Sequence, residues 1–120
     1  MSTLVAQTIS NGTVSTSTAN VINGAKAWVN FNGTGTVAIR ASYNVSSITD
    51  NGTGDYTVNF TNALADANWA VVSTVQLTGV SSLANGQQGT PVSTAARIIV
   101  LNSVNGGQID PTYVNVAIFR

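Results

Sequence analysis

Few side chains in this 120-residue sequence could do acid, base or nucleophilic chemistry. It has four aspartates, four lysines and arginines together, and no histidine, cysteine or glutamate. General acid–base catalysis most often uses histidine or a carboxylate, and a hydroxyl nucleophile needs a neighbouring base to activate it. We therefore expect no catalytic residues and predict that the protein is not an enzyme.

Asp50 and Asp55 are the two carboxylates that come closest together in the sequence, on either side of a predicted turn. Paired carboxylates about 5–9.5 Å apart can hydrolyse glycosides, but one pKa must be raised by burial, which an exposed turn does not provide. Calcium also takes carboxylates in flexible loops, yet two are few and the EF-hand spacing is absent. Asp and Asn in turns more often bond their own backbone. We therefore predict no metal site and no cofactor.

The charge content limits the partners that the protein can have. Charged residues make up 7% of the sequence and the formal net charge is zero. Nucleic-acid binding depends on clustered Lys and Arg, and a membrane span needs about 20 apolar residues, so neither partner is expected. A surface with few charges is easily desolvated, which suits a subunit packed against its copies. A simple polar extracellular surface explains the composition equally well.

The elements that must position these residues are predicted to be short β-strands. Six of the 11 glycines follow an asparagine, and Asn-Gly is the strongest short-range signal for a hairpin turn. Apolar residues alternate with polar ones between these turns, which is the period of a strand. Hairpins are predicted over residues 28–40 and 43–61, and further strands over 69–77, 96–102 and 113–119. We expect an all-β fold, an antiparallel β-sandwich of about seven strands.

Two parts of the chain differ from this pattern. Residues 1–24 are rich in Ser, Thr and Asn and are predicted to form an N-terminal arm for docking or inter-subunit contact, ahead of a β-sandwich domain over 25–120. Residues 79–94 lack periodicity, and a long irregular loop is a common place for a binding site. Within that loop Asn85, Gln87 and Gln88 would offer neutral hydrogen-bonding groups to the hydroxyls of a receptor sugar.

The large aromatic side chains lie in the alternating segments. We expect five of them to fill the core or a subunit interface. They are Trp28, Phe31, Tyr56, Phe60 and Trp69. Stacking of a sugar on one or two of these rings is the alternative. In the first hairpin Gly33 is expected at positive φ, so that valine there would break the turn.

Two stretches of sequence carry a resemblance to a known group. The first begins AKAWVNFNGTGTVAIR at Ala25 and continues as YNVSSITDNGTGDYTVNF from Tyr43 to Phe60; the second is the closing VAIFR. Together, over residues 25–70 and the last five, they resemble a C-terminal β module that recurs in tailed-bacteriophage tail fibre and virion structural proteins.

The resemblance implies a phage virion structural protein on the particle surface that forms a homotrimer and contacts other virion proteins through residues 1–24. Only about 24 residues precede the module, so no fibre shaft is expected. This favours a compact capsid decoration or a short fibre or spike subunit. The alternative is a tail-fibre tip that binds a host surface receptor or glycan.

Overall fold

The computed structural model describes residues 5–13, 15–17, 24–77, 83–87 and 89–120, and every regular element among them is a β-strand. The all-β prediction is therefore confirmed. None of these residues belongs to a helix long and apolar enough to cross a lipid bilayer.

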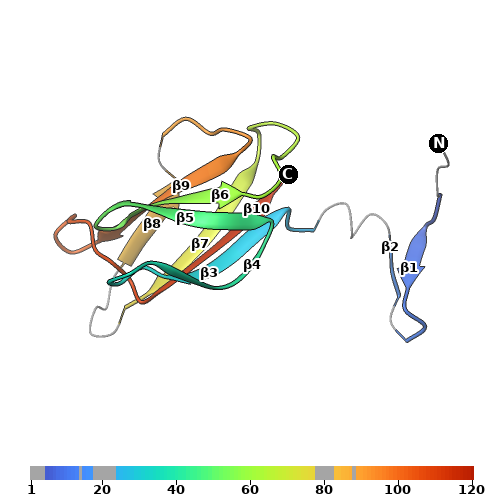
Figure 1. Cartoon of the computed structure of the whole chain (residues 1–120), viewed down its shortest axis with the longest axis horizontal. Coiled ribbons are helices and arrows are strands. Elements are labelled where there is room, and N and C mark those ends of the chain that lie inside the picture. The colour runs from blue at the N-terminus through green and yellow to red at the C-terminus, as the bar shows by residue number, and fades with distance from the viewer. Residues whose placement is uncertain (1–4, 14, 18–23, 78–82, 88) are drawn as a thin grey trace.

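Eight strands form two four-stranded antiparallel sheets, with the orders β4-β3-β10-β7 and β5-β6-β9-β8, as Figure 1 shows. The strands of the first sheet are β3 (Ala27–Asn32), β4 (Ala38–Tyr43), β7 (Ala70–Gln76) and β10 (Tyr113–Phe119). Those of the second are β5 (Val45–Gly52), β6 (Asp55–Phe60), β8 (Leu83–Gln87) and β9 (Ala95–Asn102). Both predicted hairpins are present, as β3–β4 and β5–β6.

The inward faces of the two sheets pack on one shared core. Strand β3 is buried at Ala27, Val29 and Phe31, and its partner β10 is buried at every second residue from Val114 to Ile118. Rings meet edge to face between segments, with centroids 5.2 Å apart for Phe31 and Tyr56. The period-two pattern thus separates a buried face from an outer face on each strand.

The chain passes from one sheet to the other at Asn44, between β4 and β5. The backbone of Asn44 has a φ of 54°, a conformation that asparagine tolerates better than most residues. Its side-chain amide donates to the carbonyls of Lys26, at 3.0 Å, and Asn62, at 3.1 Å, and accepts a bond from the Asn62 N–H. Asn44 therefore fixes this corner of the domain.

The structure corrects the prediction for residues 79–94. Strand β8 lies inside this stretch and pairs with β9, so the sheets hold eight strands rather than about seven. Asn85-Gly86 is part of β8 rather than a turn. The pattern failed here because Asn-Gly is a poor strand former, whereas pairing with the buried strand β9 decides the local structure.

The prediction for the first turn was also wrong in detail. Gly35, with a φ of 58°, has the left-handed backbone there, and Gly33 does not. Gly33 is constrained by space instead, because an added Cβ would lie 2.5 Å from the Tyr56 hydroxyl and 2.8 Å from the Pro111 carbonyl oxygen. A side chain at this position could be accepted only if neighbouring atoms shifted.

The predicted N-terminal arm contains a short hairpin of its own. Strands β1 (Thr8–Ser10) and β2 (Ser15–Ser17) pair antiparallel and form a separate two-stranded sheet. Val5 and Ile9 are 88% and 52% exposed, so these two apolar side chains are left largely uncovered. An isolated two-stranded hairpin is marginally stable in water, so it would gain from a partner surface.

Candidate binding surfaces

The outer face of the β4-β3-β10-β7 sheet carries a group of exposed rings, and we call it the aromatic face. Tyr43 and Trp28 occupy opposed positions on β4 and β3, and Tyr113 and Phe119 lie at the two ends of β10. Their exposed fractions are 57%, 40%, 41% and 40% respectively. Exposed rings gathered on one sheet face are typical of a surface that binds a partner.

A row of hydrogen bonds crosses the aromatic face from one edge of the sheet to the other. Arg40 donates to the Asn30 side-chain oxygen at 3.5 Å, and the Asn30 amide donates to the Asn115 oxygen. The Asn115 amide in turn donates to the Thr74 hydroxyl at 3.2 Å. Every acceptor in the row is used by its neighbour, so these side chains are held in place and their desolvation costs little.

The aromatic face is almost without charge. Strands β3, β4, β7 and β10 contain no aspartate, glutamate or lysine, and Arg40 is their one charged residue. The Arg40 guanidinium carbon lies 4.1 Å from the centroid of the Tyr113 ring, a cation–π geometry, and its Nη2 donates to the Thr112 carbonyl at 2.8 Å. A partner that covers this face would therefore have to desolvate only one charged side chain, Arg40.

A shallow groove crosses the middle of the aromatic face, with a volume of about 360 Å³. Trp28 and Val72 form its sides, and Asn115 and Ala117 lie between them on β10. The register places Trp28 and Val72 on either side of Ala117, so this small residue leaves the hollow.

A second hollow, of about 530 Å³, lies where the Asn44 corner meets the last residue of the chain, and we call it the end pocket. Lys26, Tyr43, Asn44, residues 61–65 and Arg120 line it. Arg120 pairs with Asp66 through two bonds of 2.6 and 2.5 Å. These bonds lower the pKa of Asp66 to about 2 and raise that of Arg120. The volume is in the range of small-molecule sites.

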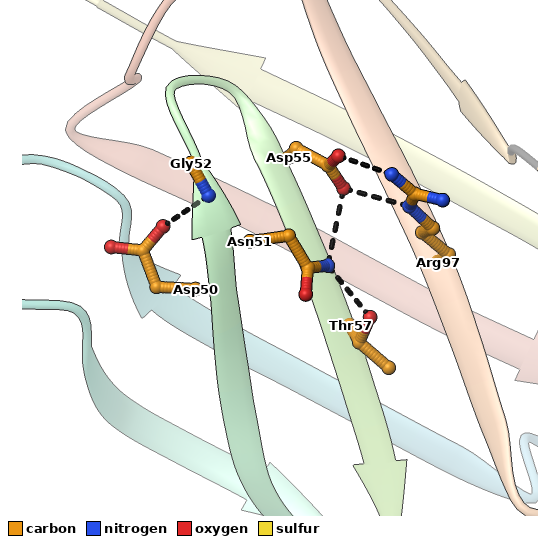
Figure 2. Close-up of polar contacts among 6 residues, drawn as sticks. All are labelled: Asp50, Asn51, Gly52, Asp55, Thr57 and Arg97. Carbon is orange, nitrogen blue, oxygen red and sulfur yellow. Dashed lines mark hydrogen bonds and ion pairs between the residues drawn. The ribbon is translucent and has the colours of Figure 1, made fainter.

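The outer face of the β5-β6-β9-β8 sheet has a different character, shown in Figure 2. Asp55 accepts from the Nε and Nη2 atoms of Arg97, at 2.9 and 2.5 Å, and from the Asn51 amide at 3.2 Å. The Arg97 bonds lower the pKa of the buried Asp55 carboxyl, and desolvation opposes them. Asp55 is thus a structural ion-pair partner.

The structure gives the Asp50–Asp55 turn no metal-site geometry. The Asp50 carboxylate turns away from Asp55 and accepts from the Gly52 N–H at 3.0 Å, closing its own turn (Figure 2). Asp55 is already neutralised by Arg97. Across the described part of the chain, no three His, Cys, Asp or Glu residues cluster as metal ligands.

One titratable cluster lies between the sheets, with Tyr56 buried and Asp110 half-buried. The Tyr56 hydroxyl lies 2.8 Å from an Asp110 carboxylate oxygen and 3.0 Å from the Gly33 carbonyl oxygen, and the Gly54 N–H donates to the same Asp110 oxygen at 2.7 Å. Burial and Asp110 raise the pKa of Tyr56 far above its usual range. The phenol is therefore held protonated, as a tie between the β9–β10 connection and both sheets.

The structure separates the five predicted aromatics into two groups. Phe31, Tyr56, Phe60 and Trp69 are buried in the core, whereas Trp28 lies on the aromatic face. The period-two alternation could have shown that Trp28 faces outward, because Trp28 shares its side of β3 with Asn30 and Asn32. Tyr43, Tyr113 and Phe119 belong to the same face.

Contact of Asn85, Gln87 and Gln88 with a receptor stays a prediction, and the structure describes the first two of these residues. Asn85 bonds the Ser73 hydroxyl on β7 of the other sheet and so ties the two edge strands together. Gln87 is exposed at the end of β8, and Gln88 lies outside the described residues. The sequence could not show that β8 and β7 are adjacent edges.

Comparison with protein-family models, with curated proteins and with solved structures found no match. We therefore base the proposals about binding on the geometry of the molecule itself. The described surfaces offer an aromatic face for a partner and an end pocket for a small molecule.

Proposed function

We propose that the protein is a structural subunit of a tailed-bacteriophage particle, an antiparallel β-sandwich that assembles as a homotrimer through its aromatic face. The aromatic face carries this proposal, because it exposes four rings over four strands that hold a single charged residue. The resemblance of residues 25–70 to phage virion modules is the reason for proposing a phage particle as its location. The role we propose is a compact capsid decoration or a short fibre or spike subunit.

The composition of the aromatic face favours another copy of this chain as its occupant. Interface cores are enriched in Trp, Tyr, Phe and Arg and depleted of Lys, Glu and Asp. The aromatic face follows that pattern with Trp28, Tyr43, Phe119 and Arg40. Because charged residues make up only 7% of the sequence, a second copy brings few charges that must be matched.

The size of the aromatic face favours a closed ring over a face-to-face dimer. Four strands about 4.8 Å apart and about seven residues long cover roughly 450 Å². A stable interface buries about 800 Å² on each partner, so this face supplies roughly half of that area. In a cyclic trimer each subunit uses two different patches, and the aromatic face then meets a separate patch on its neighbour.

Residues 1–24 are proposed to contact other virion proteins. The exposed Val5 and Ile9 of this segment support an attachment role, because burying them would stabilise a hairpin that gains little from its own chain. We propose no contact with nucleic acid and no insertion into a membrane.

The virion assignment can be tested on whole phage particles. Gold-labelled antibodies raised against the purified chain should decorate intact particles at fixed positions on capsid or tail in electron micrographs. Mass spectrometry of gradient-purified particles should detect the same chain. Absence of the chain from purified particles, with detection in the infected-cell lysate, would contradict a virion role.

A second candidate function is a tip that binds a host-surface glycan, and the end pocket favours it. This pocket has the volume of a small-molecule site and one aromatic wall, Tyr43. Its lining does not include Asn85, Gln87 or Gln88, the predicted receptor contacts. The end pocket extends beyond the aromatic face and shares only Tyr43 with it.

A further inference from the structure

We infer that Asn105, in the β9–β10 connection, is a site of spontaneous deamidation in the folded protein, where its side-chain amide is converted into aspartate and isoaspartate. This modification site is independent of both proposed functions. The inference comes from a comparison of the Asn-Gly pairs, because asparagine is a chemically labile residue and the structure describes five of these six pairs.

The reaction needs only the chain and water. The backbone nitrogen of the glycine loses its proton and attacks Cγ of the asparagine side chain. The new C–N bond closes a cyclic imide, and the side-chain nitrogen takes up protons from water and leaves as ammonia. Water then opens one of the two C–N bonds of the ring, which gives aspartate or isoaspartate. Glycine favours this attack because it has no Cβ to hinder a close approach.

The Asn105 side chain is held in an arrangement that favours the attack. Its Oδ1 atom accepts a hydrogen bond from the Gly107 N–H at 2.9 Å. Negative charge develops on this oxygen when Cγ is attacked, and a donor already aimed at such an oxygen lowers the barrier. Residues 103–108 are all exposed, so water can reach the ring and open it.

The attacking nitrogen of this pair is held by a bond within the same turn. The Gly106 N–H donates to the Asn102 carbonyl at 2.7 Å. Exposed turns open at a small cost in free energy, whereas core strands open only near the cost of global unfolding. We therefore expect the reaction to proceed through brief opening of this turn while both sheets stay folded.

The Asn32-Gly33 pair is protected by packing. The Asn32 oxygen also accepts from a backbone N–H, that of Thr34 at 3.2 Å, so the difference from Asn105 lies in the two nitrogen atoms. The Asn32 amide nitrogen donates to the Thr34 carbonyl at 2.7 Å, which fixes the side chain. Gly33 is buried, and its N–H donates to the Pro111 carbonyl at 3.0 Å. Freeing this nitrogen requires the first hairpin to separate from the β9–β10 connection.

The Asn51-Gly52 pair is protected by polar contacts, which Figure 2 shows. The Asn51 amide nitrogen donates to Asp55 at 3.2 Å and to the Thr57 hydroxyl at 2.8 Å, so the side chain cannot turn towards Gly52 without losing both bonds. The Gly52 N–H donates to the Asp50 carboxylate at 3.0 Å. This negative charge opposes the loss of a proton from the attacking nitrogen.

The two remaining pairs fall on opposite sides of this division. Asn85 lies in strand β8, and its amide bonds the Ser73 hydroxyl, so we expect it to be protected. Asn11 shares the activating contact of Asn105, because its Oδ1 accepts from the Thr13 N–H at 3.1 Å. We expect Asn11 to react as well, in the separate N-terminal hairpin.

Deamidation at Asn105 changes the charge of the domain. Each event adds one negative charge to a chain whose formal net charge is zero. The modified turn lies outside strands β3, β4, β7 and β10, so the aromatic face keeps its composition. An aged sample should therefore contain several charge forms of one folded protein.

The test is site-resolved peptide mapping by mass spectrometry after incubation of the full chain in mildly alkaline buffer. A second sample is kept unfolded in guanidinium chloride. In the folded chain we expect Asn105 to react roughly tenfold or more faster than Asn32 and Asn51, because the bonds at those two sites add to the barrier. In guanidinium chloride the three rates should become similar.

Gly107→Pro tests the activating contact, because proline has no N–H to donate to the Asn105 oxygen. We expect a slower reaction at Asn105 and an unchanged rate at Asn11, which serves as the internal control. Circular dichroism checks the fold of the variant. If the variant does not fold, the comparison of folded and unfolded wild-type samples still decides the inference.

Several results would overturn the inference. Equal rates at Asn105 and Asn51 in the folded chain would show that the contacts give no protection. The same order of rates in guanidinium chloride would show that local sequence, and not the fold, sets them. A folded chain with Asn105 intact, after the unfolded sample has reacted, would remove the site. An unchanged rate at Asn105 in a folded Gly107→Pro variant would contradict the role of the Gly107 N–H.

Discussion

Trp28 on β3 and Tyr43 on β4 lie directly opposite each other in the antiparallel register, and both side chains point to solvent rather than into the core. Phe31, three residues after Trp28, lies on the other side of the same strand and is fully buried. One hairpin therefore supplies both a core ring and two rings of the aromatic face. Tyr43 also lines the end pocket, so the two binding surfaces meet at this residue.

Gly33→Ala should destabilise the domain. The new Cβ would lie 2.5 Å from the Tyr56 hydroxyl and 2.8 Å from the Pro111 carbonyl, so the core must shift to accept it. We expect a loss of about 1–3 kcal/mol in the free energy of unfolding, measured by urea denaturation. Gly86→Ala is the control, since its Cβ meets nothing within 4 Å. Equal stability of the two variants would show that this close packing is not limiting.

Tyr56→Phe should weaken the buried tie between the sheets. The variant keeps the ring against Phe31 but removes the hydroxyl that lies 2.8 Å from Asp110. A half-buried carboxylate that loses a donor should cost about 1–3 kcal/mol of unfolding free energy, because hydrogen bonds to charged groups are the stronger ones. Tyr113→Phe is the matched control, because that ring is exposed. An unchanged urea midpoint in Tyr56→Phe would refute the structural role of the cluster.

The Asp55–Arg97 pair should make stability depend on acid pH. The pKa of Asp55 in the folded protein lies below its ordinary value of 3.8, chiefly through the Arg97 hydrogen bonds. The stabilisation is therefore fully present above about pH 5 and is lost as the pH falls through the ordinary value towards the lowered one. Asp55→Asn should flatten this dependence in denaturation curves recorded from about pH 6 to 2. A slope equal to that of the unaltered protein would contradict the assignment.

Asn85→Ala should lower stability rather than remove a receptor contact. Its side chain bonds Ser73 across the two edge strands, and a half-buried amide that loses this bond costs about 0.5–1.5 kcal/mol. Gln87→Ala, at the exposed end of the same strand, is expected to be neutral. Thermal denaturation compares the two variants, and phage adsorption should be the same for both. Loss of adsorption in a fully stable Asn85→Ala variant would contradict this expectation and support the predicted receptor contact.

The strands were predictable where side chains alternate strictly. β10 follows the alternation from Tyr113 to Phe119, and the β5–β6 turn is at Thr53-Gly54, directly after Asn51-Gly52 at the end of β5. β8 was not predictable, because Leu83–Gln87 has no alternation and is a strand only through its pairing with β9. Local propensity is a weak guide where tertiary pairing decides the structure.

The binding surfaces depended on information that the sequence does not carry. The alternation assigns Trp28 to the same side as Asn30, but only the strand order brings β4, β3, β10 and β7 side by side as one face. Lys26 and Arg120 are 94 positions apart in the sequence, and β3–β10 pairing brings them to one pocket. Such non-local neighbours follow from topology rather than from spacing.

Native mass spectrometry of the purified chain at micromolar concentration tests the central claim, assembly through the aromatic face, most directly. We predict a homotrimer, and Trp28→Thr should dissociate it while the monomer stays folded, because Trp28 is 40% exposed and threonine suits a strand. Val104→Ser is the control, since it removes an 80% exposed apolar side chain from a turn away from this face, and it should stay trimeric. A stable monomer of the unaltered chain, or a trimer that persists in Trp28→Thr, would contradict the account.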